Sequence, residues 1–214
     1  MDGLSGDEHG APGNSLVRLK VVVAVASMGA VSLLPFLAGA QQDVYKDPND
    51  TRGRLDMKRV EFAGRNKVRY KIFTFPRWKT AEIRDRGFVV VFFDTFGNER
   101  FDYYALVRSN GNKLNGSLWR DRKRKKDYRV ANLSTWRAGR RTLGLRVPIG
   151  RMKWPETREF YKWRVQTLFT GGDCRSVCFD VVPNNGRVTV VRPGATPTPS
   201  PTVTPTPTPT ETLP

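Results

Sequence analysis

The feature that most constrains the fold is the alternation of apolar and polar side chains through the middle of the chain. Residues 68–72, 142–149 and 161–169 each place apolar side chains at every second position. A period of two is the repeat of a β-strand with one face buried and the other in solvent. Residues 88–93 are apolar throughout, which predicts a central strand covered on both faces.

Six further stretches are strand-like, and clusters of Gly and Asn separate several of them. We therefore expect an all-β, antiparallel β-sandwich of the jelly-roll or immunoglobulin-like type, with about 9–10 strands, over residues 44–192. One helical turn is expected within residues 79–86. The six stretches are residues 55–62, 101–108, 114–119, 128–133, 177–182 and 187–192.

The start of the chain has the pattern of a secretion signal. Arg18 and Lys20 precede an apolar run over residues 21–37, and the triplet Ala38-Gly39-Ala40 follows it. A cationic flank, a short apolar stretch and an A-x-A site predict that residues 1–40 are a signal peptide, cleaved after Ala40. The alternative is an uncleaved membrane anchor, although the apolar run is slightly shorter than a bilayer span.

The end of the chain has the composition of a spacer. Residues 195–214 contain eight Thr and seven Pro, mostly in alternation. Proline at every second position opposes both helix and sheet and favours an extended backbone. We expect residues 195–214 to form a disordered Pro/Thr-rich tail.

The charge of the intervening segment indicates what it could bind. Residues 41–194 contain 35 Lys and Arg against 16 Asp and Glu. For an exported protein, this surplus favours anionic cell-wall polymers or acidic polysaccharides as partners and argues against nucleic acid. Membrane contact is expected only through an uncleaved signal. The alternative is that the charge serves solubility alone.

The distribution of histidine limits the chemistry. The only histidine is His9, which lies in the predicted signal peptide. A chain without His9 has no imidazole for Ser-His-Asp or Cys-His catalysis, or for most zinc sites. A glycan hydrolase based on paired carboxylates is the remaining enzymatic alternative, but no spacing singles out a pair. We expect a protein that is not an enzyme.

The densest positive charge defines a candidate polyanion-binding segment. Seven of the ten residues from 120 to 129 are cationic. Arginine pairs in a bidentate manner with phosphate and carboxylate, so a projecting cationic hairpin is suited to anionic polymers. The alternative is a solvated loop without a partner. The predicted contact residues are Arg120, Arg122, Lys123, Arg124, Lys125, Lys126 and Arg129.

Two of the tryptophans are candidates for stacking on sugar rings. Trp119 and Trp136 lie on either side of the cationic segment, where exposed indoles would contact a glycan. The alternative is burial in the core. Trp163 lies on the apolar side of an alternating stretch and is expected in the core.

A run of oxygen-bearing side chains is a candidate calcium loop. Asp94, Asn98, Glu99 and Asp102 lie within nine residues around Gly97. Calcium takes six to eight oxygen ligands, and it is the only cofactor that the sequence suggests. The alternative is a plain hairpin between two neighbouring strands.

The two cysteines, Cys174 and Cys178, are separated by three residues. In an oxidising compartment such a pair is expected to form a small disulfide that fixes a turn.

Three patterns occur together in this chain: the segment from Asp47 to Asp56 (DPNDTRGRLD), the D-T-x-G-x4-D-Y run from Asp94 to Tyr103, and the cysteine pair. Together they resemble a group of secreted actinobacterial β-sandwich domains. The resemblance spans residues 47–183 and implies a bacterial cell-surface or secreted protein with an all-β fold. Members of the group often carry an acidic residue near the position of Phe96.

The sequence therefore predicts a secreted, non-catalytic binding module of the cell envelope that contacts anionic polymers or glycans through a cationic face. The alternative is a calcium-stabilised structural or adhesion module that uses the loop from Asp94 to Asp102.

Overall fold

The computed structural model describes residues 42–172, 174–192 and 194. The predicted signal peptide and the predicted Pro/Thr-rich tail lie outside these residues. The described part is all-β, as predicted, and contains two single-turn 3-10 helices, η1 (Ala81–Ile83) and η2 (Ile149–Arg151). The strands are β1 (Gln42–Lys46), β2 (Met57–Ala63), β3 (Lys67–Thr74), β4 (Gly87–Asp94), β5 (Tyr103–Ser109), β6 (Leu114–Arg120), β7 (Tyr128–Gly139), β8 (Thr142–Pro148), β9 (Phe160–Gly171), β10 (Cys174–Val182) and β11 (Val188–Val191).

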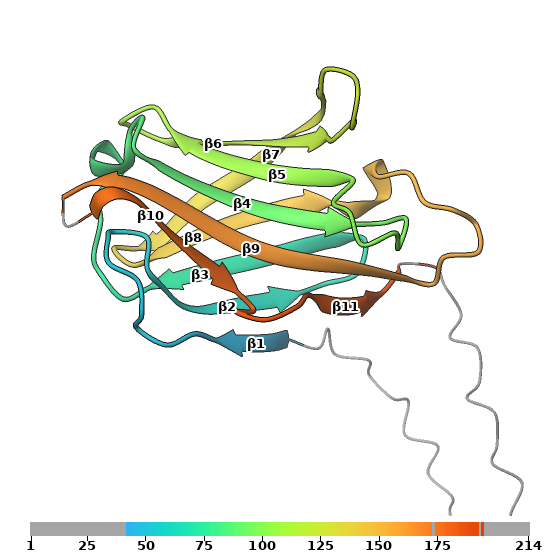
Figure 1. Ribbon diagram of the computed structural model, residues 1–214, viewed down its shortest axis with the longest axis horizontal. Coiled ribbons are helices and arrows are strands. Elements are labelled where there is room, and N and C mark those ends of the chain that lie inside the picture. The colour runs from blue at the N-terminus through green and yellow to red at the C-terminus, as the bar shows by residue number, and fades with distance from the viewer. Residues whose placement is uncertain (1–41, 173, 193, 195–214) are drawn as a thin grey trace, which may run out of the picture. The chain divides into compact units, whose positions relative to one another are not determined.

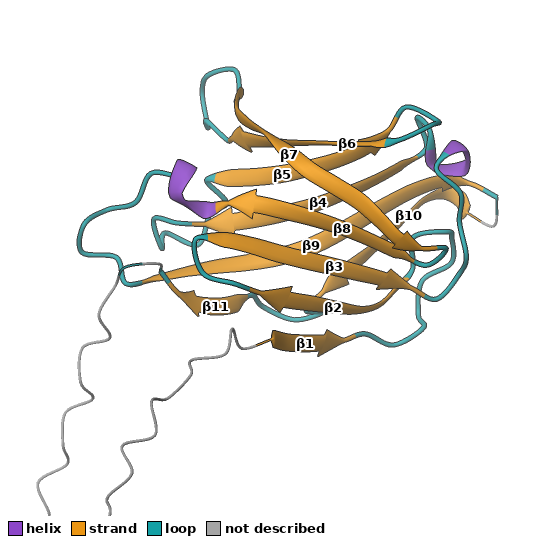
Figure 2. Ribbon diagram, turned by 180° about the vertical axis from the view of Figure 1, so that it is seen from behind, coloured by secondary structure: helices purple, strands orange, loops and turns teal. Residues whose placement is uncertain are grey.

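All strands belong to one antiparallel sheet in the order β1-β2-β3-β8-β7-β6-β5-β4-β9-β10, with β11 paired to β9. The long strand β7 connects the two halves of the sheet, because its first part pairs with β6 and its second part with β8 (Figures 1 and 2). The sheet rolls until its ends approach each other, and the Met57 backbone N–H of β2 donates to Asp180 Oδ2 of β10 at 2.6 Å. The result is a nearly closed, barrel-like sheet.

The predicted strand positions agree with ten of the eleven strands, from β2 to β11. The additional strand is β1, whose five residues include Gln42, Asp43 and Lys46. Its sequence carries little apolar signal, since only Val44 and Tyr45 of the five residues are apolar. Backbone pairing with β2 and the core contact of Tyr45 place this terminal strand. Within the described residues, no helix is both long enough and apolar enough to span a membrane.

Trp163 is the centre of an aromatic cluster in the interior. Its indole ring lies 5.1 Å from the ring of Tyr45, 5.5 Å from Phe62 and 5.2 Å from Tyr70, measured between centroids. These residues come from β9, β1, β2 and β3 respectively, so the cluster joins strands of both halves of the sheet. Trp163 is fully buried, as the sequence predicted.

We expect Trp163→Ala to lower the free energy of unfolding by about 3–5 kcal/mol, because it leaves a cavity where strands of both halves meet. Urea unfolding followed by circular dichroism measures the change. The matched control is Trp119→Ala, which removes the same side chain from a half-buried position and should cost less than half as much. Equal losses in the two variants would contradict a central role for Trp163.

Candidate functional site

The outer face of β4 differs from the expectation for residues 88–93. Val89, Val91 and Phe93 are buried in the core, whereas on the opposite face Val90 is buried and Phe88 and Phe92 are half-buried. β4 lies between β5 and β9, so it is a central strand as predicted, but its outward side is covered only in part. The apolar outward residues are shielded instead by side chains of the neighbouring strands, and the face is accessible to a ligand.

A cross-strand row of side chains occupies this face. Sheet register aligns one outward residue from each of β7, β6, β5, β4 and β9. The Trp119 and Tyr104 rings are parallel within 6°, with centroids 6.3 Å apart, and Tyr104 lies 6.5 Å from Phe92. In order across the sheet, the row is Arg129, Trp119, Tyr104, Phe92 and Arg164.

Phe101 extends this row beside β4. Its ring centroid is 4.8 Å from that of Phe92, and the guanidinium carbons of Arg164 and Arg187 lie 5.2 Å and 4.3 Å from the Phe101 centroid. We call Trp119, Tyr104, Phe92 and Phe101 the aromatic row. Its two ends are therefore flanked by arginine, at Arg129 on one side and at Arg164 and Arg187 on the other.

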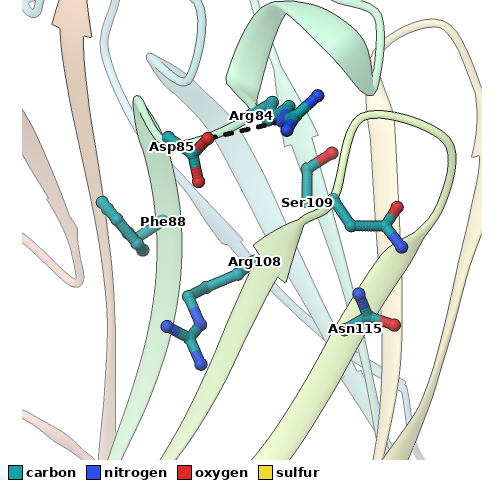
Figure 3. A pocket seen from close by; sticks show the side chains of 7 residues that line it. Arg84, Asp85, Phe88, Arg108, Ser109 and Asn115 are labelled. Carbon is teal, nitrogen blue, oxygen red and sulfur yellow. Dashed lines mark ion pairs between the residues drawn. The ribbon is translucent and has the colours of Figure 1, made fainter.

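Two adjoining hollows lie beside the aromatic row. One has a volume of about 470 Å³ and reaches from Arg84 to Asn115, and the other, of about 370 Å³, continues to Arg129. They share Arg108 and Asn115, so together they form one groove over β4 to β7, which we call the arginine groove. In Figure 3, the Arg84–Asp85 ion pair lies at one end of the first hollow, and Arg108 extends away from it.

Asp127 and Arg122 fix the cationic hairpin between β6 and β7. Asp127 Oδ1 accepts from the Arg122 backbone N–H at 3.0 Å, and Asp127 Oδ2 accepts from the Tyr104 hydroxyl at 3.1 Å. The Arg122 guanidinium donates to the Lys126 carbonyl and lies 5.0 Å from the Tyr128 ring centroid. Because Tyr104 belongs to the aromatic row, the hairpin and the row are connected directly. Burial, followed by the hydrogen bond to Asp127, raises the pKa of Tyr104 to about 12.

The predicted polyanion-binding residues divide into two groups. Arg120 is half-buried, near the rings of Phe96 and Tyr103, and Arg122 is committed to the hairpin itself. The other five are exposed, and none takes part in an ion pair among the described residues. The loop that carries four of them projects beyond the adjoining strands (Figure 1). The exposed cations are Lys123, Arg124, Lys125, Lys126 and Arg129.

The two candidate stacking tryptophans lie apart. Both indoles are half-buried, but Trp119 stacks in the aromatic row, whereas Trp136 covers Gly144 of β8. Arg129 of β7 is the register partner of Trp119, and Trp136 lies seven residues further along β7. At the rise of a β-strand, seven residues correspond to about 23 Å. The structure therefore brings Trp119, but not Trp136, to the arginine groove and the cationic hairpin.

The candidate calcium loop is a hairpin whose carboxylates have protein donors. Asp94 Oδ1 accepts from the Gly97 N–H at 2.6 Å, and Asp94 Oδ2 accepts from Arg187 Nη1 at 3.0 Å. Asp102 Oδ2 accepts from the backbone N–H groups of Thr95 and Phe96, which partly offset the rise in its pKa caused by burial.

The other two predicted ligands of this loop are exposed. Asn98 Oδ1 accepts from the Arg100 N–H at 3.1 Å, and Glu99 lies in the left-handed backbone region at φ 61°. A calcium ion would have to compete with Arg187 for Asp94, and the calcium loop remains a prediction.

Cys174 and Cys178 are at disulfide-bonding distance, as predicted, with their Cα atoms 5.6 Å apart. They lie in β10, next to Gly53 of the segment between β1 and β2.

Sequence reasoning did not identify Tyr104, Phe92 and Arg108 as surface residues. The alternation in β5 contained the signal for Tyr104 and Arg108, but only sheet register shows that these side chains share a face with Trp119. The sequence analysis also did not anticipate that Asp47, Asp50 and Asp56 come together near Asp180.

No family model, curated protein or solved structure matches this chain.

We expect Arg187→Ala to lower the free energy of unfolding by about 2–4 kcal/mol, because it leaves the fully buried Asp94 carboxylate without its cation. Thermal and urea unfolding measure the change. Arg175→Ala, at an exposed arginine of β10, is the matched control and should change stability by less than about 0.5 kcal/mol. Full recovery of the Arg187→Ala variant on addition of calcium would favour the calcium loop over the plain hairpin.

Proposed function

We propose that this protein is a secreted, non-catalytic binding module of the cell envelope that holds an anionic polysaccharide or cell-wall polymer. The binding surface comprises the aromatic row, the arginine groove and the exposed cations of the hairpin. One observation carries the proposal: a row of four rings, flanked by arginine at both ends, adjoins a groove and a cationic hairpin on one open face. Each part of this surface matches a different part of an anionic glycan.

The dimensions of the row favour an extended ligand. The residues from Arg129 to Arg164 cross five neighbouring strands, which is about 19 Å at the usual strand spacing. This length suits a short stretch of polymer better than a single sugar. The rings offer apolar faces to the C–H groups of sugars, and the guanidinium groups pair with carboxylate or phosphate.

The sequence supports the extracellular part of the proposal. The signal pattern of residues 1–40 and the disulfide favour an oxidising compartment, where anionic wall polymers are the abundant polyanions. The resemblance to secreted actinobacterial β-sandwich domains points the same way. Within the all-β class the proposal includes a β-sandwich, which is supported by the contacts of Trp163 of β9 with Phe62 of β2 and Tyr70 of β3.

Catalysis is not part of this proposal. The groove is lined mainly by arginine, asparagine and serine, which are binding groups rather than the paired carboxylates that glycan hydrolysis needs.

The first test reverses the charge of Lys123, Arg124, Lys125 and Lys126 to Glu in the full chain. Co-sedimentation with isolated bacterial cell walls is measured at low and at high salt. We expect the wild type to bind at low salt and to lose binding at high salt, and the variant to bind at least about tenfold more weakly at low salt.

The matched control reverses Arg65, Lys67, Arg69 and Arg146, which are exposed cations on and beside β3 and β8. This control changes the net charge by the same amount, so it should bind much more strongly than the hairpin variant. If both variants bind equally weakly, the loss of binding comes from overall charge and not from the hairpin. If the wild type does not bind at low salt, the proposal is excluded.

The second test is Trp119→Ala, assayed with the same walls at moderate salt. Loss of one stacking ring is expected to weaken binding by about 3- to 10-fold. Trp136→Ala removes an indole outside the aromatic row and should change binding by less than about twofold. A larger effect of Trp136→Ala would move the glycan contact away from the aromatic row.

A further inference from the structure

Four carboxylates from two distant parts of the chain gather where the two ends of the rolled sheet approach each other. Asp47, Asp50 and Asp56 belong to the segment between β1 and β2, and Asp180 belongs to β10. One carboxylate oxygen from each of the first three lies within 4.8 Å of the others. Asp180 is buried and close enough to raise the pKa values of Asp47 and Asp56. We call these four residues the aspartate cluster.

Two members of the cluster are buried, and the Thr51 backbone N–H donates to one of them, the Asp56 carboxylate. Asp47 is 8% exposed and Asp56 is 3% exposed. Both carboxylate oxygens of Asp47, and Oδ1 of Asp56, have no hydrogen-bond partner among the described residues. Asp180 differs, because its two oxygens accept from the backbone N–H groups of Met57 and Val181. The unpartnered oxygens are therefore those of Asp47 and Asp56, within the cluster.

Among the described residues, no cation forms an ion pair with this cluster, although cations are abundant. None of the four ion pairs formed within residues 42–172, 174–192 and 194 includes a member of the cluster. Burial, followed by the nearby charges of Asp180 and Asp50, raises the pKa of Asp56 to about 7, and burial and Asp180 also raise that of Asp47. A proton shared between Asp47 and Asp180 would neutralise only one of the charges. Burying ionised carboxylates without a positive partner costs a large amount of folding free energy. A bound cation would offset this cost.

The backbone holds these carboxylates in place. The Asp47 N–H donates to the Lys58 carbonyl at 3.0 Å, and the Asp56 carbonyl accepts from the Phe75 N–H at 2.9 Å. The Thr51 hydroxyl donates to the Phe179 carbonyl of β10 at 3.3 Å. The segment between β1 and β2 is thus hydrogen-bonded to β2, to the loop after β3 and to β10.

The disulfide supports the same segment. Gly53 has φ 118°, and a Cβ atom at this position would lie 2.8 Å from Cys174 Sγ. Only glycine allows this close approach, so the segment packs directly against the disulfide-bonded part of β10. The carboxylates are held in position before any ligand arrives.

We propose that Asp47, Asp50 and Asp56 bind a calcium ion, with Asp180 contributing a fourth negative charge beside it. Carboxylate oxygens without histidine or thiolate match the preference of calcium for hard oxygen ligands, and its flexible coordination suits a site completed by backbone carbonyls or water. The ion would link the β1–β2 segment to β10 and so fasten the two ends of the sheet. This site differs from the loop between Asp94 and Asp102 and does not depend on the proposed glycan binding.

The test uses the full chain, treated with a chelator and then exchanged into chelator-free buffer. Calcium chloride is added in a calorimetric titration, and thermal unfolding is followed with and without calcium. We expect one calcium ion per chain and a rise in Tm of several degrees at saturation. Magnesium at the same concentration should have a smaller effect, because it requires a tighter octahedral arrangement.

Three variants locate the site. Asp50→Asn changes the exposed member of the aspartate cluster and should weaken calcium affinity at least about tenfold while preserving the fold. Asp56→Asn should remove the rise in Tm, and its circular dichroism spectrum checks the fold. Glu99→Gln removes an exposed carboxylate of the other candidate loop and should retain the full response.

Absence of a calcium-dependent heat and Tm shift in the wild type would overturn the proposal. A response retained in Asp50→Asn and Asp56→Asn but lost in Glu99→Gln would overturn it in favour of the loop from Asp94 to Asp102. An equal response in all three variants would show only adventitious binding to surface carboxylates.

Discussion

Packing of the Trp163 indole against Tyr45, Phe62 and Tyr70 is the interaction on which the rest of the structure depends. A single antiparallel sheet of this size has two faces, and one of them must leave water. Trp163 is on β9, whereas its three partners are on β1, β2 and β3, at the other end of the strand order. Contact between them requires the sheet to roll. The long strand β7 belongs to both halves of the rolled sheet, because it pairs with β6 in one half and with β8 in the other.

The rolled sheet determines where its charged groups can lie. The interior accepts the apolar side chains, so the outward side of β4 to β7 and β9, with the loops beside these strands, carries the rings and arginines of the aromatic row and the arginine groove. Residues 41–194 contain 35 Lys and Arg against 16 Asp and Glu, so one-to-one pairing would leave 19 of these cations without a carboxylate. In the hairpin between β6 and β7 this surplus is concentrated on a loop that Asp127 and Arg122 hold in a defined shape.

The same roll produces the opposite situation where the ends of the sheet meet. There the segment between β1 and β2 is fixed against β10, and it brings Asp47, Asp50 and Asp56 beside Asp180. Two concentrations of like charge therefore coexist in one domain. The cationic one is exposed, where water and salt screen the repulsion, while most of the anionic one is buried, where screening is weak. This difference is why the aspartate cluster requires a bound cation and the hairpin does not require a bound anion.

Local patterns in the sequence determined the strand positions, the burial of Trp163 and the cysteine pair, because each depends on residues that are close together in the chain. Strand β1 escaped prediction because only Val44 and Tyr45 of its five residues are apolar, and pairing with β2 and contact of Tyr45 with Trp163 place it. Register between strands decided that Trp119, Tyr104 and Phe92 form one row and that Trp136 lies elsewhere. The candidate calcium residues named from sequence lie within one short run, whereas the aspartate cluster joins Asp56 to Asp180 across 124 positions. Only the tertiary structure could bring these two carboxylates together, because closure of the sheet around the aromatic core sets the distance between its ends.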